Sequence, residues 1–250
     1  MNQHFLDYLG ECDCCPRHCR VNRLNGESGI CGIDSSIQVS HIGLHFGEEP
    51  PISGTHGSGT IFFSGCNLQC VFCQNYQISQ QFQNNKNKIV TTETLALEMV
   101  RLQEEGAHNI NFVSPSHVVF QMAEAIQVAR RNGLTIPIVY NSNGYDSVTS
   151  LQRIRGLVDI FLPDIKYTDN RLGETFSNIH NYADVIENVL KEMYSQVGHL
   201  KTDDAGIALS GILVRHLVLP SCGTNSRNCL KLLAELSTDI HISLMSQYSP

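Results

Sequence analysis

From residue 59 onward, short apolar runs alternate with segments whose apolar residues recur at helical spacing. The runs are rich in β-branched residues, as buried strands are, and most of them end at polar residues. They span 60–63, 109–113, 136–140, 157–162, 212–219 and 240–244. Each is separated from the next by an insert long enough for a helix. The pattern predicts right-handed βα units around a parallel sheet.

Six such units favour an α/β fold in the form of a partial (βα)6 TIM-like barrel. Residues 1–58 form a small cysteine-rich N-terminal extension with a strand at 36–46 and a loop rich in glycine and proline, in which we expect no regular structure. Residues 59–250 then form the barrel. The sixth strand lies at the end of the chain with no helix after it, which predicts a barrel truncated at its C-terminus.

Helix ends and connections are predicted from single residues. Thr92 and Asp146 precede helical patterns and are expected to cap them. The polar segment 77–88, rich in asparagine and glutamine, is expected to be an exposed connection.

Charge and hydropathy disfavour several kinds of partner. The 250 residues are 42% hydrophobic, carry a net charge of −7, and show no basic run interleaved with aromatic residues, so we expect no nucleic-acid partner. The first fifteen residues lack a cationic start and an apolar core, and no apolar stretch approaches the roughly 20 residues of a membrane span. We therefore expect a cytoplasmic protein without membrane contact, whose ten cysteines are reduced thiols available to metals.

Three cysteines follow the first strand at the spacing CxxxCxxC. Cys66, Cys70 and Cys73 can converge on one inorganic centre, and a fourth protein ligand is missing. A structural zinc site normally has four protein ligands, whereas a four-iron cluster with three cysteines leaves one iron open to a substrate. Zinc and metal-free cysteines are the alternative interpretations.

A second cysteine group lies near the N-terminus. Cys12, Cys15, Cys19 and Cys31 supply four thiolates for a closed site, and Cys14 is left over. A structural zinc site, a second iron–sulfur cluster that feeds electrons to the first, and no metal at all are all compatible with this spacing.

Polar tetrads follow the strands where barrel chemistry gathers, at the C-terminal strand ends. They are Ser114–His117, Asn141–Gly144 and Pro163–Lys166. Four residues at the end of strand 36–46 and in the loop before the first barrel strand either face this site or are solvated: His45, Glu48, Glu49 and His56.

The cysteine spacing, with Phe72 directly before the last cysteine, resembles the radical S-adenosylmethionine (SAM) superfamily. Several segments resemble the activating enzymes of pyruvate formate-lyase, above all their homologues with an N-terminal CPRxC segment. These segments are SGCNLQCVFCQN, IPIVYNSNGY, VDIFLPDIKY and RHLVLP. The resemblance covers essentially the whole chain. It implies a radical SAM barrel in which Cys66, Cys70 and Cys73 hold a [4Fe-4S] cluster whose open iron is chelated by SAM.

The resemblance also implies an activity. SAM is cleaved reductively to a 5′-deoxyadenosyl radical, which abstracts hydrogen from an unknown substrate. A glycyl radical enzyme, hence a protein substrate, is one candidate. Such an oxidoreductase needs a low-potential electron donor such as flavodoxin or ferredoxin.

Seven further residues are candidates for cofactor binding. Phe72 and Asn75 flank the cluster near the adenine, and Asn143 is placed at the ribose. Asp164 and Lys166 resemble the family's Asp-x-Lys element, and Arg215 resembles an arginine that pairs with the SAM carboxylate. Ser114 stands where many members carry Gly-Gly-Glu, which holds the SAM amine.

Simpler roles exist for three of these candidates. Arg215 would pair with Asp164 without any ligand, Asn143 would be a turn residue, and Lys166 would be solvated. For the whole chain, the rivals are an iron–sulfur electron-transfer or cluster-carrier protein without SAM chemistry, and a barrel with structural zinc only.

Overall fold

The computed structural model describes residues 4–84 and 87–246. The predicted truncation concerns the end of the chain at 247–250, which lies outside the described residues. No helix in the described part of the chain is long and apolar enough to cross a membrane.

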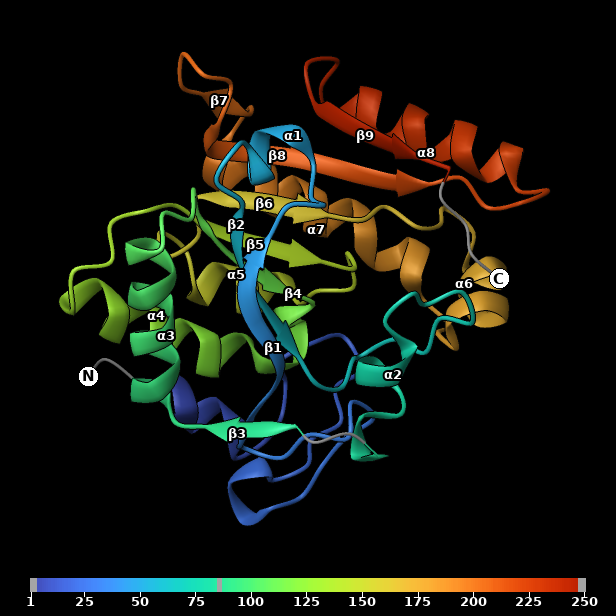
Figure 1. The fold of residues 1–250 in the computed structure, drawn as a ribbon. Helices are drawn as coiled ribbons and strands as arrows, with labels where there is room; N and C mark the ends of the chain where they lie inside the picture. The colour runs from blue at the N-terminus through green and yellow to red at the C-terminus, as the bar shows by residue number, and fades with distance from the viewer. Residues whose placement is uncertain (1–3, 85–86, 247–250) are drawn as a thin grey trace.

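Six parallel strands form the central sheet (Figure 1). In sheet order they are β2 (Ser58–Phe63), β4 (Ile110–Val113), β5 (Ile138–Ser142), β6 (Ile160–Pro163), β8 (Ala208–Leu217) and β9 (His241–Met245). Each neighbouring pair is parallel. The six predicted strands and their parallel order are therefore confirmed.

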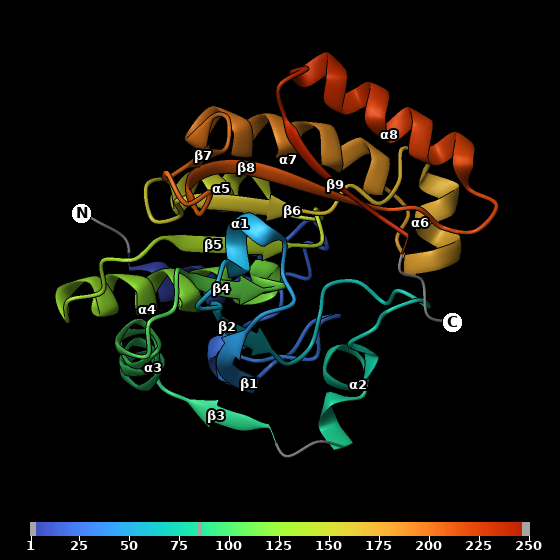
Figure 2. The same ribbon diagram turned by 45° about the horizontal axis from the view of Figure 1, so that its top comes forward.

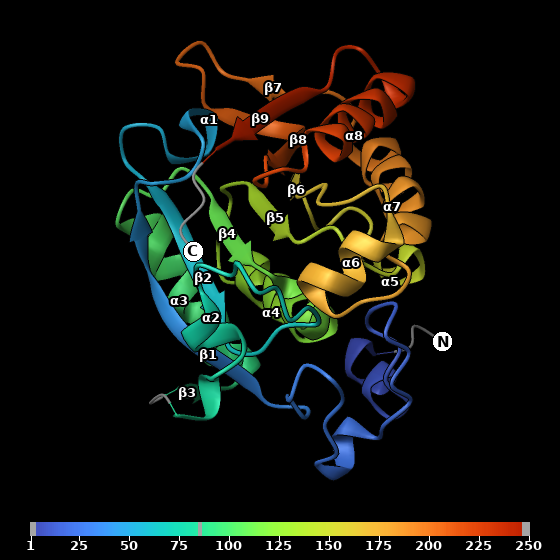
Figure 3. The same ribbon diagram turned by 90° about the vertical axis from the view of Figure 1, so that its right-hand side faces the viewer.

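Three antiparallel strands extend the sheet. β1 (Ile37–His45) pairs with β2, β3 (Lys88–Val90) pairs with β1, and β7 (Lys201–Thr202) pairs with β8. Within the described residues no ladder joins β1 or β3 to β9, so the curved sheet stays open (Figure 3). The fold is an open, partial α/β barrel, as predicted.

Helices cover the convex face of the sheet. They are α3 (Thr92–Glu104), α4 (Val119–Arg131), α5 (Val148–Arg153), α7 (Tyr182–Val197) and α8 (Gly223–Leu236). The short α6 (Asn170–Ser177) lies instead beyond the C-terminal strand ends, where the Val71 N–H in the loop after β2 donates to the Phe176 carbonyl (Figure 3). Alternate strand residues point to the convex face: Phe112 of β4 is fully buried there and stacks on Phe63, with ring centroids 5.9 Å apart. The residues between them face the hollow of the barrel, because side chains along a strand alternate.

Two predicted helix caps are wrong by one residue. Thr91, not Thr92, caps α3, because its hydroxyl accepts the Thr94 N–H. Ser147 caps α5. Asp146 is instead buried and accepts hydrogen bonds from Tyr140 and Ser142, so its carboxylate cannot reach the helix.

The glycine- and proline-rich loop contains a short helix that the sequence analysis missed, α1 (Pro50–Ser53). Figure 2 shows it against the strands on the concave side of the sheet. Ile52 is fully buried there with Val139, Leu162 and Leu213. The loop therefore fills part of the barrel interior.

Segment 77–88 is also more structured than predicted. It overlaps α2 (Tyr76–Ser79), includes η3 (Phe82–Asn84), and its last residue begins β3. Phe82 is buried in the main core, which a purely polar connection would not allow. Its lone aromatic ring outweighs the surrounding asparagines and glutamines.

The N-terminal extension shares the core of the barrel. Its described part includes η1 (Phe5–Leu9) and η2 (Arg23–Asn25). Phe5 and Tyr8 lie on Phe120 of α4, with ring centroids 6.4 Å and 4.8 Å away. Leu9 and Ile33 are fully buried in the main hydrophobic cluster. The extension thus packs against α4 and the main core of the barrel.

Candidate functional site

The loop that carries Cys66, Cys70 and Cys73 begins where β2 ends. Gly65 has φ +78°, and a Cβ there would lie 2.5 Å from the carbonyl oxygen of Cys31. Only glycine fits both the left-handed backbone and this close approach. The loop therefore leaves the sheet directly against the N-terminal extension.

Cys66 receives two N–H groups. The Leu68 backbone N–H lies 3.4 Å from its sulfur and the Asn143 amide nitrogen 3.5 Å away. Asn143 also donates to Asn67 at 2.7 Å, which fixes its direction. Burial raises the pKa of Cys66 to about 12, and the nearby thiols Cys70 and Cys73 add to the effect. A positive metal centre would reverse this shift and deprotonate the sulfur.

The other two thiols meet hydroxyl groups. The Cys70 sulfur lies 2.9 Å from Ser177 Oγ, and the Cys73 sulfur lies 3.3 Å from Ser79 Oγ. Burial also raises the pKa of Cys70, whereas the cation of Lys166 acts in the opposite direction. Hydrogen bonds to sulfur tune the potential of iron–sulfur clusters, so all three thiols have the surroundings that such a ligand needs.

The donor set fits an iron–sulfur cluster. Three soft thiolates in one loop are ligands that a [4Fe-4S] cluster takes, and the lack of a fourth protein ligand leaves one iron open to a substrate. A structural zinc site would need a fourth protein ligand.

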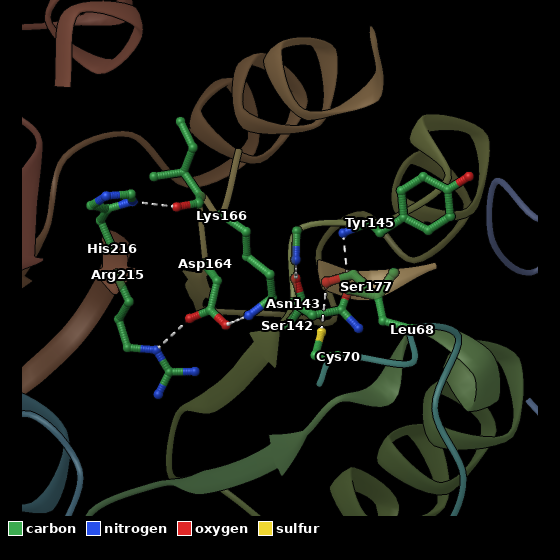
Figure 4. A network of polar contacts seen from close by, with 12 residues as sticks. Leu68, Cys70, Ser142, Asn143, Tyr145, Asp164, Lys166, Ser177, Arg215 and His216 are labelled. Carbon is green, nitrogen blue, oxygen red and sulfur yellow. Dashed lines mark hydrogen bonds and ion pairs between the residues drawn. The ribbon is translucent and has the colours of Figure 1, made fainter. Parts of the chain in front are cut away.

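A buried charge network lies beside these thiols (Figure 4). Asp164, just after β6, accepts from Lys166 Nζ at 2.7 Å and from Arg215 Nε at 3.0 Å. Burial alone would raise the pKa of Asp164, but the two cations outweigh it and hold that pKa below its ordinary value. The predicted candidates Asp164, Lys166 and Arg215 are therefore brought together at the C-terminal strand ends.

Arg215 has two more partners inside the barrel. Its guanidinium donates to the side-chain oxygen of Asn141, and Nη1 lies 3.5 Å from Glu48 Oε2. Glu48 belongs to the loop that holds α1, and its side chain is 8% exposed. Burial raises the pKa of Glu48, and the charge of Arg215 opposes that rise. This loop residue faces the site, whereas His56 stacks on His108.

The remaining candidates surround this network at different depths. Phe72 lies with its ring centroid 5.9 Å from Lys166 Nζ. Both line a small pocket with Asp164, Tyr167, Leu217 and Leu219. Ser114 adopts the left-handed region with φ +53°, and its N–H donates to the Asn141 carbonyl. Asn75 is exposed, next to α2.

Sequence reasoning missed the residues that hold the candidates in place. Buried Asn67 donates to the Tyr145 carbonyl at 2.7 Å. The hydroxyl of Tyr182 donates to the carbonyls of Asn143 and Asp164, joining two strand ends. Asn67 had one signal, its place next to Cys66. Tyr182 had none, since its partners lie far away in the chain.

The N-terminal cysteines belong to the extension, and the Cys31 carbonyl closely approaches Gly65 in the loop that carries Cys66, Cys70 and Cys73. Cys12 and Cys15 are buried, and Cys19 and Cys31 are half-buried. Burial raises the pKa of Cys15 to about 12. The unpredicted neighbour is Arg23, whose guanidinium lies fully buried beside Cys12 and Cys14.

Comparisons with known proteins agree with this geometry. The family model of the radical SAM superfamily matches residues 60–195. Two uncharacterised proteins of Methanocaldococcus jannaschii are similar: MJ0674 is 31% identical over 96% of this chain, and MJ0808 is 26% identical over 62% of it. The chain spans 66% and 49% of their respective lengths.

A solved structure shows the same fold. Methylornithine synthase (PylB) matches 76% of this chain and 53% of its own, with a TM-score of 0.51 and 17% sequence identity. At that identity the likeness concerns the fold alone, an open α/β barrel.

Proposed function

Because this chain belongs to the radical SAM superfamily, we propose that it is an enzyme that cleaves SAM reductively and abstracts hydrogen from a substrate. Family membership implies SAM-dependent radical chemistry with a [4Fe-4S] cluster and SAM as cofactors. Cys66, Cys70 and Cys73 would hold the cluster. When bound, it supplies the electron that splits SAM into methionine and a 5′-deoxyadenosyl radical.

One observation carries the proposal. Three thiols, all with hydrogen-bonding partners, lie in one loop at the end of a parallel strand, and Lys166 lies both near Cys70 and in an ion pair with Asp164. Three thiolates without a fourth protein ligand leave an iron position open to a substrate.

The chain's own side chains have distinct tasks in this proposal. Lys166 and Arg215 provide the positive charge that attracts a carboxylate, while Asp164 fixes the direction of both cations. Phe72 and Leu217 provide apolar walls on the pocket beside them. Such walls limit the access of water, which a reactive radical requires.

The substrate and partners form the finer part of the proposal. Resemblance to the activating enzymes of pyruvate formate-lyase supports a glycine residue of a partner protein as the hydrogen donor. A low-potential flavodoxin or ferredoxin would supply the electron. The net charge of −7 supports a substrate other than nucleic acid.

Product analysis tests the proposed reaction. The protein is reconstituted anaerobically with iron and sulfide, reduced, and incubated with SAM. We expect 5′-deoxyadenosine and methionine in equal amounts, their loss in Cys66→Ala, and their retention in the control Cys222→Ala. Bound iron without either product would favour an electron-transfer or carrier protein, and zinc without iron would favour a structural metal.

A further inference from the structure

Two hydroxyl groups form a chain of hydrogen bonds from the segment after β6 to the sulfur of Cys70. The Tyr167 hydroxyl lies 2.8 Å from Ser177 Oγ. Ser177 Oγ in turn lies 2.9 Å from the Cys70 sulfur (Figure 4). Tyr167 and Ser177 are both fully buried. A buried hydrogen bond is electrostatically stronger than one in water, and consecutive bonds polarise one another, so the phenol can act on the sulfur through Ser177.

The two protons of this chain have a defined direction when Cys70 binds a metal. A ligating thiolate has no proton and only accepts, so the Ser177 hydroxyl donates to it. A serine hydroxyl has a single proton, and Ser177 therefore accepts from Tyr167, whose phenol is protonated at neutral pH. The phenol thus holds the proton of Ser177 on the side of Cys70.

The last turn of α6 is bound to the loop on both sides of Cys70. The Gln69 N–H donates to the Ser177 carbonyl at 3.2 Å. The Val71 N–H donates to the Phe176 carbonyl at 2.9 Å. The final carbonyls of a helix have no partner within the helix, so the loop satisfies two of them. These two bonds hold Ser177 in place beside the sulfur.

The backbone on either side of Tyr167 is held by one side chain of α8. Asn225 accepts from the Thr168 N–H at 3.0 Å and donates to the Lys166 carbonyl at 2.8 Å. The Tyr167 ring meets the ring of Tyr182 edge to face, with centroids 5.3 Å apart. Both the backbone and the ring are therefore fixed by their neighbours, as the support of a functional group requires.

Ser79 provides a comparison within the same loop region. Its Oγ lies 3.3 Å from the Cys73 sulfur, a longer contact than that between Ser177 and Cys70. Ser79 is half-buried, so water competes for its proton. We therefore expect Ser79 to act on Cys73 independently of Tyr167.

We propose that Tyr167 is a positioning residue that raises the reduction potential of the cluster by directing the Ser177 hydroxyl at Cys70. Hydrogen bonds to a ligating sulfur stabilise the reduced form, which carries more negative charge, so a well-directed proton raises the potential. A higher potential makes reduction by a protein donor easier. The inference deepens the proposed function: it rests on a cluster at Cys66, Cys70 and Cys73, but not on the cleavage of SAM.

Redox titration of the reconstituted protein tests this role. Tyr167→Phe removes one oxygen and keeps the ring, so we expect the same iron content and a lower midpoint potential. Ser177→Ala removes the hydroxyl beside the sulfur and should lower the potential at least as much. Thr175→Ala is the control on the same helix and should leave the potential unchanged, because the exposed Thr175 hydroxyl donates to the Arg171 carbonyl. Loss of the signal in Cys66→Ala assigns it to this cluster.

A double-mutant cycle separates positioning from a general effect of the substitution. In the Ser177→Ala background the phenol has no hydroxyl to direct, so Tyr167→Phe should no longer shift the potential. In the Ser79→Ala background, which also lacks one contact between a hydroxyl and a sulfur, the shift should remain. A shift of equal size in the wild-type chain and in both backgrounds would show that Tyr167 acts by burial or solvation, and would overturn the proposal.

Tyr167→Phe alone decides the case in which Ser177→Ala does not fold. An unchanged midpoint potential at an unchanged iron content would overturn the proposal and leave the proposed function intact. A Tyr167→Phe protein that loses its fold or its cluster would show a merely structural role, and would overturn the proposal as well. A wild-type protein that assembles no cluster would overturn both, so the two failures are distinguishable.

Discussion

Asp164 shows how much one buried carboxylate organises. It faces the cations of Lys166 and Arg215, and the side chains of all three are between 15% and 17% exposed. Removing one partner of a buried ion pair leaves an uncompensated charge. A neutral side chain in place of Asp164 would leave the buried charges of Lys166 and Arg215 without the carboxylate that balances them.

Asp164→Asn should therefore destabilise the fold. We expect the free energy of unfolding, measured by chemical denaturation, to fall by about 3 kcal/mol or more. Asp169→Asn is the matched control, since Asp169 pairs with the highly exposed Arg171 and asparagine caps a helix equally well. Equal effects of the two substitutions would contradict the assigned role of Asp164.

We predict that the stability of the fold depends on pH because His117 is buried. Burial lowers its pKa to about 4 from 6.5, and its Nε2 lies 2.9 Å from the Ser64 carbonyl oxygen. The unfolded chain binds the proton first, so stability is full above about pH 6.5 and is lost as the pH falls toward 4. At about 1.4 kcal/mol per pKa unit, the loss is about 3 kcal/mol.

His117→Gln should flatten this part of the curve, because glutamine does not titrate and its amide can still donate to a carbonyl. Denaturation of both proteins between pH 7 and about 4 measures the difference. A wild-type curve parallel to that of the variant would rule out His117 as the source.

Single site residues could be predicted from the sequence where they belong to a recognisable sequence motif. The three cysteines, Asp164, Lys166 and Arg215 were all identified from the sequence as candidates. Their supports Asn67, Ser177 and Tyr182 were not, because an amide or hydroxyl acquires its role only from partners that folding brings near. Ser177, for example, lies 107 residues from Cys70.

At the scale of elements, the C-terminal ends of β5 and β6 approach each other closely at Gly144. Gly144 follows β5 with φ +78°, and a Cβ there would lie 2.2 Å from the Asp164 carbonyl oxygen and 2.6 Å from the Tyr182 hydroxyl. Gly156 has φ +82° and nothing within 4 Å. A side chain at either position would strain the left-handed backbone, but only at Gly144 would its Cβ also clash with neighbouring atoms.

Gly144→Ala should consequently cost more than Gly156→Ala. The left-handed backbone costs each variant about 1 kcal/mol. The clash at Gly144 should add about 1–3 kcal/mol and displace Asp164. Thermal unfolding measures the difference, and equal melting temperatures would show that the β5 and β6 ends are less tightly joined than we describe.

The strands and long helices were predictable because their apolar periodicity is local. Caps were missed by one residue where two hydroxyl or carboxyl residues compete, as Asp146 and Ser147 do before α5. The helix α1 was missed because proline and glycine suggest a loop. Its position depends on Ile52 packing inside the barrel, which is a long-range contact.

At the scale of the whole molecule, two thiol groups lie side by side at one end of an open barrel. The N-terminal extension shares the main core, and its Cys31 touches Gly65 in the loop of the first group. The parallel order of the barrel follows from the βα alternation. The juxtaposition of the two cysteine groups does not, since their spacing in the chain contains no information about this contact.

The central claim is that Cys66, Cys70 and Cys73 leave one iron open for SAM. The most direct test is electron–nuclear double resonance of the reduced protein with SAM labelled isotopically in its amino nitrogen. Binding of the amine to the open iron predicts a hyperfine coupling of that nitrogen to the cluster, which Cys66→Ala abolishes. A reduced cluster without any such coupling at saturating SAM would contradict the account.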